Sequence, residues 1–183
     1  MKRAVFFDLQ GTLGGDPLGN AGEFALYPFA AEAIRLINAA GMAAVVVTNQ
    51  SGIAKGRLTL AQFEERMVAL RDEPAAQGAH LDGVYCCPHS RADGCSCRKP
   101  QPELLHRAER ELGVCLAASY VVGDMGASDM ALARNSGCRA VLVRTGAGEG
   151  SLGEYRHLWA GIEPDFVAPD VLAATRWICS NVT

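Results

Sequence analysis

The chain has 183 residues, a length that suits one α/β domain, and we expect residues 1–183 to form a single domain. Hydrophobic residues make up 49% of the sequence and charged residues 20%, which is typical of a folded globular protein and not of a disordered one. The formal net charge of -3 argues against a protein that binds nucleic acid or a membrane surface. We also expect the protein to be a monomer.

The apolar run Ala4–Phe7 is too short for a secretion signal, because Asp8 interrupts it before the roughly 7 apolar residues that a signal peptide needs. No run approaches the ~20 apolar residues required to cross a bilayer. The 7 cysteines are an odd number, which does not fit a disulfide framework. We therefore expect a cytoplasmic protein, in a reducing compartment where clustered cysteines more often hold a metal.

Six short apolar runs predict the strands of one parallel sheet. Most of them are rich in valine or aromatic residues and do not alternate in polarity, as expected of strands that are covered on both faces. In chain order they are Ala4–Phe7, Ala43–Thr48, Gly83–Cys87, Tyr120–Gly123, Ala140–Arg144 and Phe166–Ala168.

Helical patterns lie between these runs, at Pro28–Ala40, Thr59–Arg71, Pro102–Leu112 and Ser128–Asn135, and Pro169-Asp170 begins a last helix. Strands that alternate with helices predict an α/β fold with a doubly wound, mainly parallel sheet, in which a ligand binds at the carboxyl ends of the strands. The glycine-rich segments Gly11–Gly22 and Gly146–Gly153 are interpreted as surface loops, and neither contains a phosphate-binding glycine motif.

Reactive side chains follow four of the predicted strands. Asp8 follows the first strand, Thr48 ends the second, Lys99 comes after the third and Asp124 after the fourth. A lone Asp at a strand end is as often a loop or helix cap, but four such groups at successive strand ends favour a functional site. We expect these four side chains to surround one crevice at the carboxyl edge of the sheet.

The chemistry of these groups is complementary. Two carboxylates and a backbone carbonyl provide the hard oxygen ligands that Mg²⁺ prefers. The ammonium group of Lys99 and the hydroxyl of Thr48 would neutralise phosphoryl oxygens, while Asp8 would attack phosphorus and form an aspartyl-phosphate. The sequence therefore predicts a site for phosphoryl transfer.

A second candidate site lies just before Lys99. Cys87, His89, Cys95 and Cys97 form the pattern C-x-H-x5-C-x-C, which matches a closed tetrahedral zinc site. Cys86 is adjacent to Cys87 and is the alternative ligand. Cys87 is preferred because it forms a Cys-Pro-His turn.

Together, Asp8–Thr12, Thr48-Asn49, Lys99 and Gly123-Asp124 with Asp129 resemble the four motifs of the haloacid dehalogenase superfamily of phosphatases. Further likenesses to the heptose bisphosphate phosphatases of that superfamily lie in Thr48–Gly56, Cys97–Pro100 and Val141–Gly146. Histidinol-phosphate phosphatases share the zinc loop and are the near alternative. Both groups lack a cap domain, and this chain has no segment long enough for one between its motifs.

The resemblance implies that Asp8 is the nucleophile and that Mg²⁺ is held by Asp8, Asp124 and the main-chain carbonyl of Gln10. Asp129 would orient Lys99 or the second shell of the metal. The implied substrate is a small sugar phosphate, above all the 7-phosphate of D-glycero-D-manno-heptose 1,7-bisphosphate.

For the remaining residues, the resemblance implies that Thr48 and Lys99 bind the transferring phosphate. Asn49 and Arg98 would contact the substrate. Zn²⁺ would shape the loop that presents Arg98 and Lys99.

Three departures from the family pattern bear on activity. The family has Asp where this chain has Gln10, and that Asp is the general acid and base of the reaction, so its loss is expected to cost about 10² to 10⁴ in rate. Met125 replaces a Lys that the heptose enzymes often carry. The segment Gly14–Ala25 matches the substrate loop of the family poorly.

These departures leave three hypotheses. The first is a Mg²⁺-dependent phosphatase of a small phosphate, slowed by Gln10. The second is a weak or inactive homologue that only binds a sugar phosphate. The third is a phosphotransferase that passes the aspartyl-phosphate to an acceptor other than water.

Overall fold

The computed structural model describes residues 2–19 and 24–181, and its centre is one six-stranded parallel sheet in the order β3-β2-β1-β4-β5-β6. All pairs of neighbouring strands run parallel. The strands are β1 Ala4–Phe7, β2 Ala43–Asn49, β3 Gly83–Cys87, β4 Tyr120–Gly123, β5 Arg139–Val143 and β6 Phe166–Ala168. The predicted α/β fold is confirmed, and each predicted strand matches to within one residue at either end.

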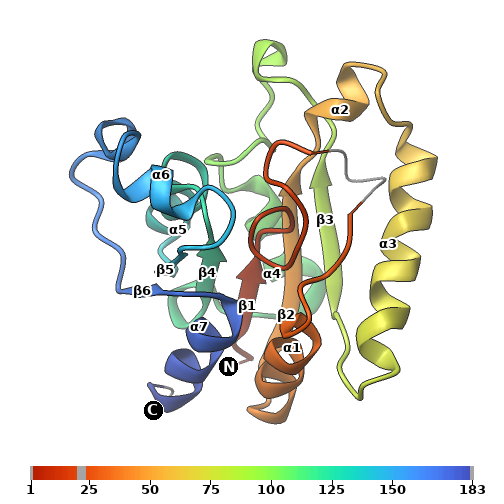
Figure 1. The fold of residues 1–183 in the computed structure, drawn as a ribbon, viewed down its shortest axis with the longest axis vertical. Coiled ribbons are helices and arrows are strands. Elements are labelled where there is room, and N and C mark those ends of the chain that lie inside the picture. The colour runs from red at the N-terminus through yellow and green to blue at the C-terminus, as the bar shows by residue number, and fades with distance from the viewer. Residues whose placement is uncertain (1, 20–23, 182–183) are drawn as a thin grey trace.

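Helices cover both faces of the sheet (Figure 1). On one face, Val5 and Phe7 of β1 belong to a core with residues of α1, α3 and α7; on the other, Ala4 and Phe6 belong to a core with residues of α4 and α5. Because successive side chains of a strand point to opposite faces, both halves of an apolar run such as Ala4–Phe7 are buried. The helices are α1 Ala30–Ala39, α2 Ser51–Ala54, α3 Leu60–Ala75, α4 Glu103–Leu112, α5 Ala131–Ser136, α6 Gly148–Leu152 and α7 Val171–Ser180.

Capping residues set the beginnings of two long helices. The Thr59 side chain accepts a hydrogen bond from the backbone N–H of Gln62, and the Gln62 side chain accepts one from the Thr59 backbone, which forms a capping box at α3. Asp170 caps α7 by accepting from the backbone N–H of Ala173. Helix α3 extends about one turn beyond the predicted end, to Ala75, because Pro74 packs on its buried side instead of ending it.

Two of the expectations about local structure were wrong. The helix expected at Ser128–Asn135 is divided into a π-helical turn, Gly126–Met130, and the short helix α5. The glycine-rich segments are not plain surface loops, because residues 11–14 are buried and Gly148 and Ser151 lie on the buried side of α6. Residues 20–23, which belong to both Gly11–Gly22 and Gly14–Ala25, lie outside the described residues.

The order of the strands decides where the site lies. β1 and β4 are neighbours although they are far apart in sequence, so the chain leaves the sheet in different directions on either side of this pair. Asp8 and Asp124 directly follow these two strands. Among the described elements, no cap domain is inserted above this edge.

Two adjacent residues of α3 provide a test of the packing. Met67 is buried with 4% of its surface exposed, whereas Val68 is 56% exposed. We expect Met67→Ala to lower the free energy of unfolding by about 2–5 kcal/mol, because it leaves a cavity in the core. Val68→Ala should change it by less than about 0.5 kcal/mol. Urea denaturation followed by circular dichroism measures both, and equal effects would contradict the orientation of α3.

Candidate active site

Three carboxylates gather at the carboxyl edge of the sheet. One side-chain oxygen from each of Asp8, Asp124 and Asp129 lies within 4.8 Å of the others. Asp8 is 8% exposed, and Asp124 and Asp129 are buried. Like charges this close in a buried site repel strongly, so the arrangement requires compensating positive charge.

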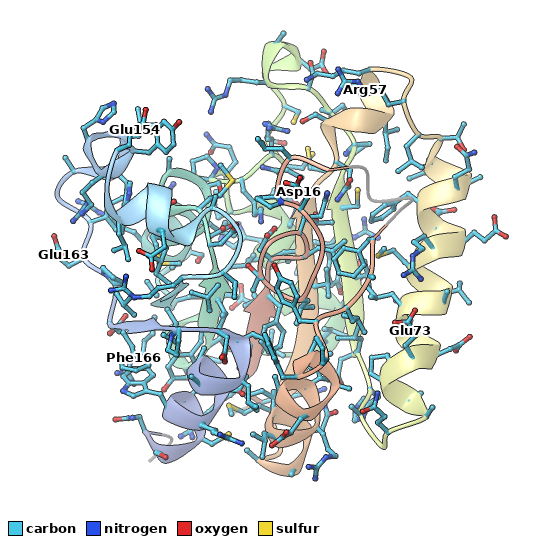
Figure 2. All side chains as sticks on the ribbon, viewed as in Figure 1. Asp16, Arg57, Glu73, Glu154, Glu163 and Phe166 are labelled. Atoms are coloured by element: carbon cyan, nitrogen blue, oxygen red, sulfur yellow. The ribbon has the colours of Figure 1, made fainter. Side chains whose placement is uncertain are left out.

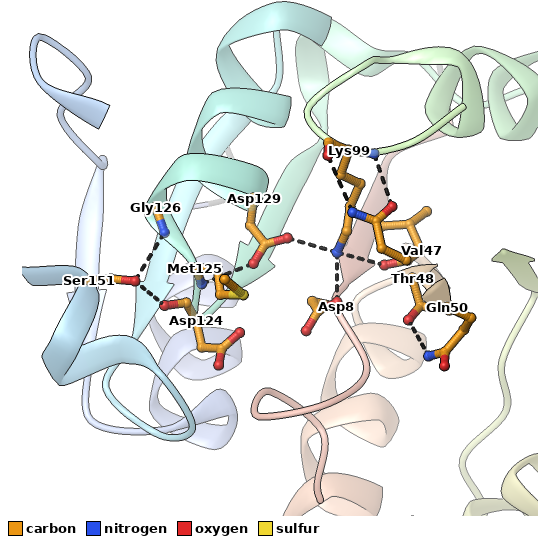
Figure 3. Close-up of polar contacts among 11 residues, drawn as sticks. Asp8, Val47, Thr48, Gln50, Lys99, Asp124, Met125, Gly126, Asp129 and Ser151 are labelled. Carbon is orange, nitrogen blue, oxygen red and sulfur yellow. Dashed lines mark hydrogen bonds and ion pairs between the residues drawn. The ribbon is translucent and has the colours of Figure 1, made fainter. Parts of the chain in front are cut away.

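Lys99 supplies part of that charge (Figure 3). Its Nζ donates to Asp8 Oδ1 at 2.6 Å, to Asp129 Oδ1 at 2.7 Å and to the Val47 carbonyl at 3.1 Å. Burial alone would lower the pKa of Lys99, but the Asp129 and Asp8 carboxylates raise it above its ordinary value. Lys99 therefore remains protonated and has all three of its hydrogens in use.

Asp124 is held by the segment after β5. Its Oδ2 accepts from the backbone N–H of Ala147 at 2.7 Å. The Ser151 hydroxyl donates to the Asp124 carbonyl at 2.9 Å and accepts from the backbone N–H of Gly126 (Figure 3). Asp124 Oδ1 is buried and has no hydrogen-bond partner. Burial and the nearby Asp8 raise the pKa of Asp124 to about 8.

These observations fit a divalent cation. A partnerless carboxylate oxygen beside two other carboxylates is the donor set of a hard oxygen-preferring ion such as Mg²⁺. Three carboxylates against one ammonium group leave two negative charges, which one such ion would cancel. The residues present therefore suit the metal that the sequence predicted.

A chain of amides connects the end of β2 to the segment after β1. The Gln50 side chain donates to Thr48 Oγ1 at 2.9 Å and to Gln10 Oε1 at 3.0 Å. Gln10 Nε2 in turn donates to the carbonyls of Asp16 and Gly19. Since the hydroxyl oxygen of Thr48 accepts from Gln50, the hydroxyl hydrogen remains available to a ligand in the pocket.

Asn49 and Arg98 brace the loop that carries Lys99. Asn49 Oδ1 accepts from the backbone N–H of Lys99, and its Nδ2 donates to the Lys99 carbonyl. Arg98 donates to the Ser51 hydroxyl and to the His89 carbonyl. Both side chains line the pocket, but a substrate contact from either stays a prediction.

The pocket in front of Asp8 has a volume of about 380 Å³. Asp8, Thr48 and Lys99 line it as expected, whereas Asp124 is fully buried and is not among the described residues of the lining. Sequence reasoning did not single out three exposed cations at its rim, Lys55, Arg57 and Arg91. Figure 2 shows Arg57, beyond α2, and Asp16 at the same end of the molecule. Their positions in the sequence could have indicated these cations: Lys55 and Arg57 follow α2, and Arg91 lies between His89 and Cys95 of the zinc-site pattern.

Cys87, His89, Cys95 and Cys97 converge as the sequence pattern predicted. The Sγ–Sγ distances are 3.2, 3.6 and 3.6 Å, and His89 Nδ1 lies 3.3 Å from Cys97 Sγ and 3.7 Å from Cys87 Sγ. Tetrahedral Zn²⁺ with Zn–S bonds of about 2.3 Å would hold its sulfurs roughly 3.7 Å apart, so small adjustments suffice. Cys86 is outside this cluster, and burial raises the pKa of its thiol to about 12.

Comparison with known proteins places this geometry in a family. Residues 96–174 match the HAD-hydrolase-like family. The D-glycero-D-manno-heptose-1,7-bisphosphate 7-phosphatase of Thermosynechococcus vestitus is 36% identical over 195 residues, which cover 99% of this chain and 97% of that protein. The chain belongs to the haloacid dehalogenase-like phosphatases. The family resemblance inferred from the motifs is thereby confirmed.

Further relatives agree with this assignment. The heptose bisphosphate 7-phosphatase of Escherichia coli K12 is 42% identical over 155 residues, covering 78% of this chain and 80% of the relative. The crystal structure of a B. bronchiseptica D,D-heptose 1,7-bisphosphate phosphatase, complexed with magnesium and phosphate, aligns with a TM-score of 0.87 at 29% identity and covers 98% and 99% of the two chains. Within the haloacid dehalogenase-like phosphatases, the chain is therefore a homologue of the heptose bisphosphate 7-phosphatases.

The buried Asp124 predicts a pH dependence of stability in buffer without added divalent cations. Its folded-state pKa of about 8 lies above the unfolded value of about 3.9, so the folded chain keeps a proton that the unfolded chain loses. Asp124 should therefore make the free energy of unfolding fall as pH rises between these values, by up to about 1.4 kcal/mol per pH unit. Asp8, whose pKa burial raises to about 6, adds to this fall below that pH.

Asp124→Asn removes this titrating group and should make the fall with pH shallower. Urea denaturation at several pH values compares the two proteins. An unchanged slope in the variant would show that Asp124 is not the cause.

The Cys and His cluster predicts one bound Zn²⁺ per chain of this haloacid dehalogenase-like phosphatase. Metal analysis of the purified protein should find one equivalent, and Cys97→Ala should lose it because a closed site needs all four ligands. Cys86→Ala is the matched control and should keep the metal. Loss of the metal from Cys86→Ala together with its retention by Cys87→Ala would show that Cys86 is the ligand in place of Cys87.

Proposed function

We propose that the chain is a Mg²⁺-dependent phosphoric monoester hydrolase of a sugar phosphate, with the 7-phosphate of D-glycero-D-manno-heptose 1,7-bisphosphate as its substrate. The observation that carries this proposal is the buried group of Asp8, Lys99, Asp129 and Asp124, in a homologue of heptose bisphosphate 7-phosphatases. We further propose that residues 1–183 form one domain that acts as a cytoplasmic monomer. No helix in the described part of the chain has the length and apolarity to span a membrane.

In this proposal, Asp8 is the nucleophile. Its Oδ1 is held by Lys99, which leaves the second oxygen for in-line attack on phosphorus. Asp8, Asp124 and the main-chain carbonyl of Gln10 would hold Mg²⁺, whose charge would offset that of the phosphoryl oxygens. The Thr48 hydroxyl would donate to one of these oxygens, since Gln50 occupies its acceptor side.

The rim of the pocket supports a substrate with a second phosphate. Lys55, Arg57 and Arg91 line the pocket together with Arg98, so a group away from the reacting phosphorus would meet positive charge. Cationic side chains attract and orient phosphate groups. A bisphosphate would be oriented by this charge better than a monophosphate. Histidinol phosphate carries an ammonium group at its other end, and these cations would repel it.

A non-catalytic sugar-phosphate-binding protein is the second candidate, favoured by two observations. Gln10 cannot exchange a proton, and Met125 adds a 40% exposed apolar side chain to the rim of the pocket. Calorimetry that shows tight binding of heptose 1,7-bisphosphate without hydrolysis would support this candidate over the first.

Phosphate release decides between the two. With Mg²⁺ present, the wild-type chain should release phosphate from heptose 1,7-bisphosphate, and Asp8→Asn should not, because an amide cannot form the aspartyl-phosphate. Histidinol phosphate serves as the competing substrate and should be turned over more slowly. Release by wild type no faster than by Asp8→Asn would refute the hydrolase proposal.

A further inference from the structure

The pocket is poor in groups that can move a proton. Of the described residues that line it, Asp8 and Asp129 are the acids, the bases are lysines and arginines, and no histidine, glutamate, tyrosine or cysteine is among them. Proton transfer in catalysis is most effective when the pKa of the group lies near the working pH. A histidine or an unpaired carboxyl group normally supplies this property, and neither is among the described residues that line the pocket. Asp124, whose Oδ1 has no partner, is buried outside that lining and is a proposed ligand of Mg²⁺.

Neither acid is free for the task. Asp8 is the nucleophile of the proposed function. Asp129 accepts from Lys99 at Oδ1 and from the backbone N–H of Met125 at Oδ2, so both of its oxygens are engaged (Figure 3). Lys99 has its three hydrogens on Asp8, Asp129 and Val47. The cations Lys55, Arg57 and Arg91 are exposed to solvent at the rim.

Gln10 stands two residues after the nucleophile and is fixed in place. Its Oε1 accepts from Gln50 at 3.0 Å, and its Nε2 donates to Asp16 at 3.1 Å and to Gly19 at 2.8 Å. The carboxamide thus has a partner for its oxygen and for both hydrogens. Gln10 therefore lines the pocket in a fixed orientation and cannot serve as an acid or a base.

From this inventory we infer that the pocket favours phosphate donors whose leaving group departs as a stable anion, such as aryl phosphates, acyl phosphates and phosphoanhydrides, and that the phosphoenzyme accumulates. This inference rests on the proposed function, because Asp8 must be the nucleophile. It goes beyond that function by naming the donor class and the slow step.

The two half-reactions show why. In the first, a bond forms between Asp8 Oδ and phosphorus, and the bond to the leaving oxygen breaks with its electron pair. An alkoxide must then take a proton that none of the described residues lining the pocket provides, whereas a phenolate or carboxylate leaves as it is. In the second, water attacks phosphorus, the bond to Asp8 Oδ breaks, and the proton of the water passes unassisted to bulk solvent. Missing proton transfer typically costs about 10² to 10⁴ in each step.

A burst experiment with 4-nitrophenyl phosphate and Mg²⁺ tests the inference. We expect rapid release of about one nitrophenolate per chain, followed by a slow steady phase limited by hydrolysis of the phosphoenzyme. Acid-quenched protein should carry one phosphoryl group by intact mass spectrometry. Glycerol 3-phosphate, with an alkoxide leaving group, should form the phosphoenzyme about 10² to 10⁴ more slowly.

Gln10→Asp and Gln10→Asn are the matched variants, because they differ only in whether the group can exchange a proton. Gln10→Asp should remove the burst and raise turnover of glycerol 3-phosphate at least about tenfold above that of Gln10→Asn. Equal rates in the two variants, or equal phosphoenzyme formation from both donors by wild type, would overturn the inference while leaving the hydrolase proposal intact. If no donor reacts faster than it does with Asp8→Asn, both proposals fail.

Discussion

The site depends on the two buried ion pairs that Lys99 forms with the carboxylates of Asp8 and Asp129. An ammonium group buried at the end of β1 is stable only if acids surround it, and acids buried there are stable only if a cation lies between them. Asp8 and Asp129 meet this requirement from two neighbouring strand ends, at 2.6 and 2.7 Å from Lys99 Nζ. Asp8, the proposed nucleophile, is therefore held in one orientation by Lys99 in the protein alone.

The charge that remains determines what else the site accepts. Lys99 cancels one of three negative charges, and Asp124 is left with a buried oxygen that has no partner. Burial and Asp8 raise the pKa of Asp124, so the pocket edge is electrostatically incomplete in the protein alone. A divalent cation would complete it, and the site would then suit a phosphate dianion.

Much of the fold could be predicted from the sequence, because buried parallel strands are continuous apolar runs that need no tertiary information. The meeting of Asp8 and Asp124 at one edge followed from the same argument. The cluster of Cys87, His89, Cys95 and Cys97 was also predictable, since the spacing of these residues within one short segment nearly fixes their convergence.

What the sequence could not show depends on contacts between distant backbones. A substrate contact from Asn49 stays a prediction, but the sequence did not indicate that both of its polar atoms would hold the backbone of Lys99. Nothing in the glycine-rich pattern after β5 indicated that Ala147 and Ser151 would hold Asp124. Gly146 has a positive φ of 59° and packs so closely that a Cβ there would collide with Asp124 and Gly11, a constraint visible only in three dimensions.

The segment after β5 is also among the last parts of the chain to be synthesised. The Thr145 hydroxyl donates to the carbonyl of Gly11 across 134 positions of sequence, next to the contacts of Ala147 and Ser151 with Asp124. Translation makes Asp8, the proposed nucleophile, first and the residues that hold Asp124 last. A nascent chain shorter than about 150 residues would lack Ser151 and its contact with Asp124, so the proposed metal site could be completed only near the end of translation.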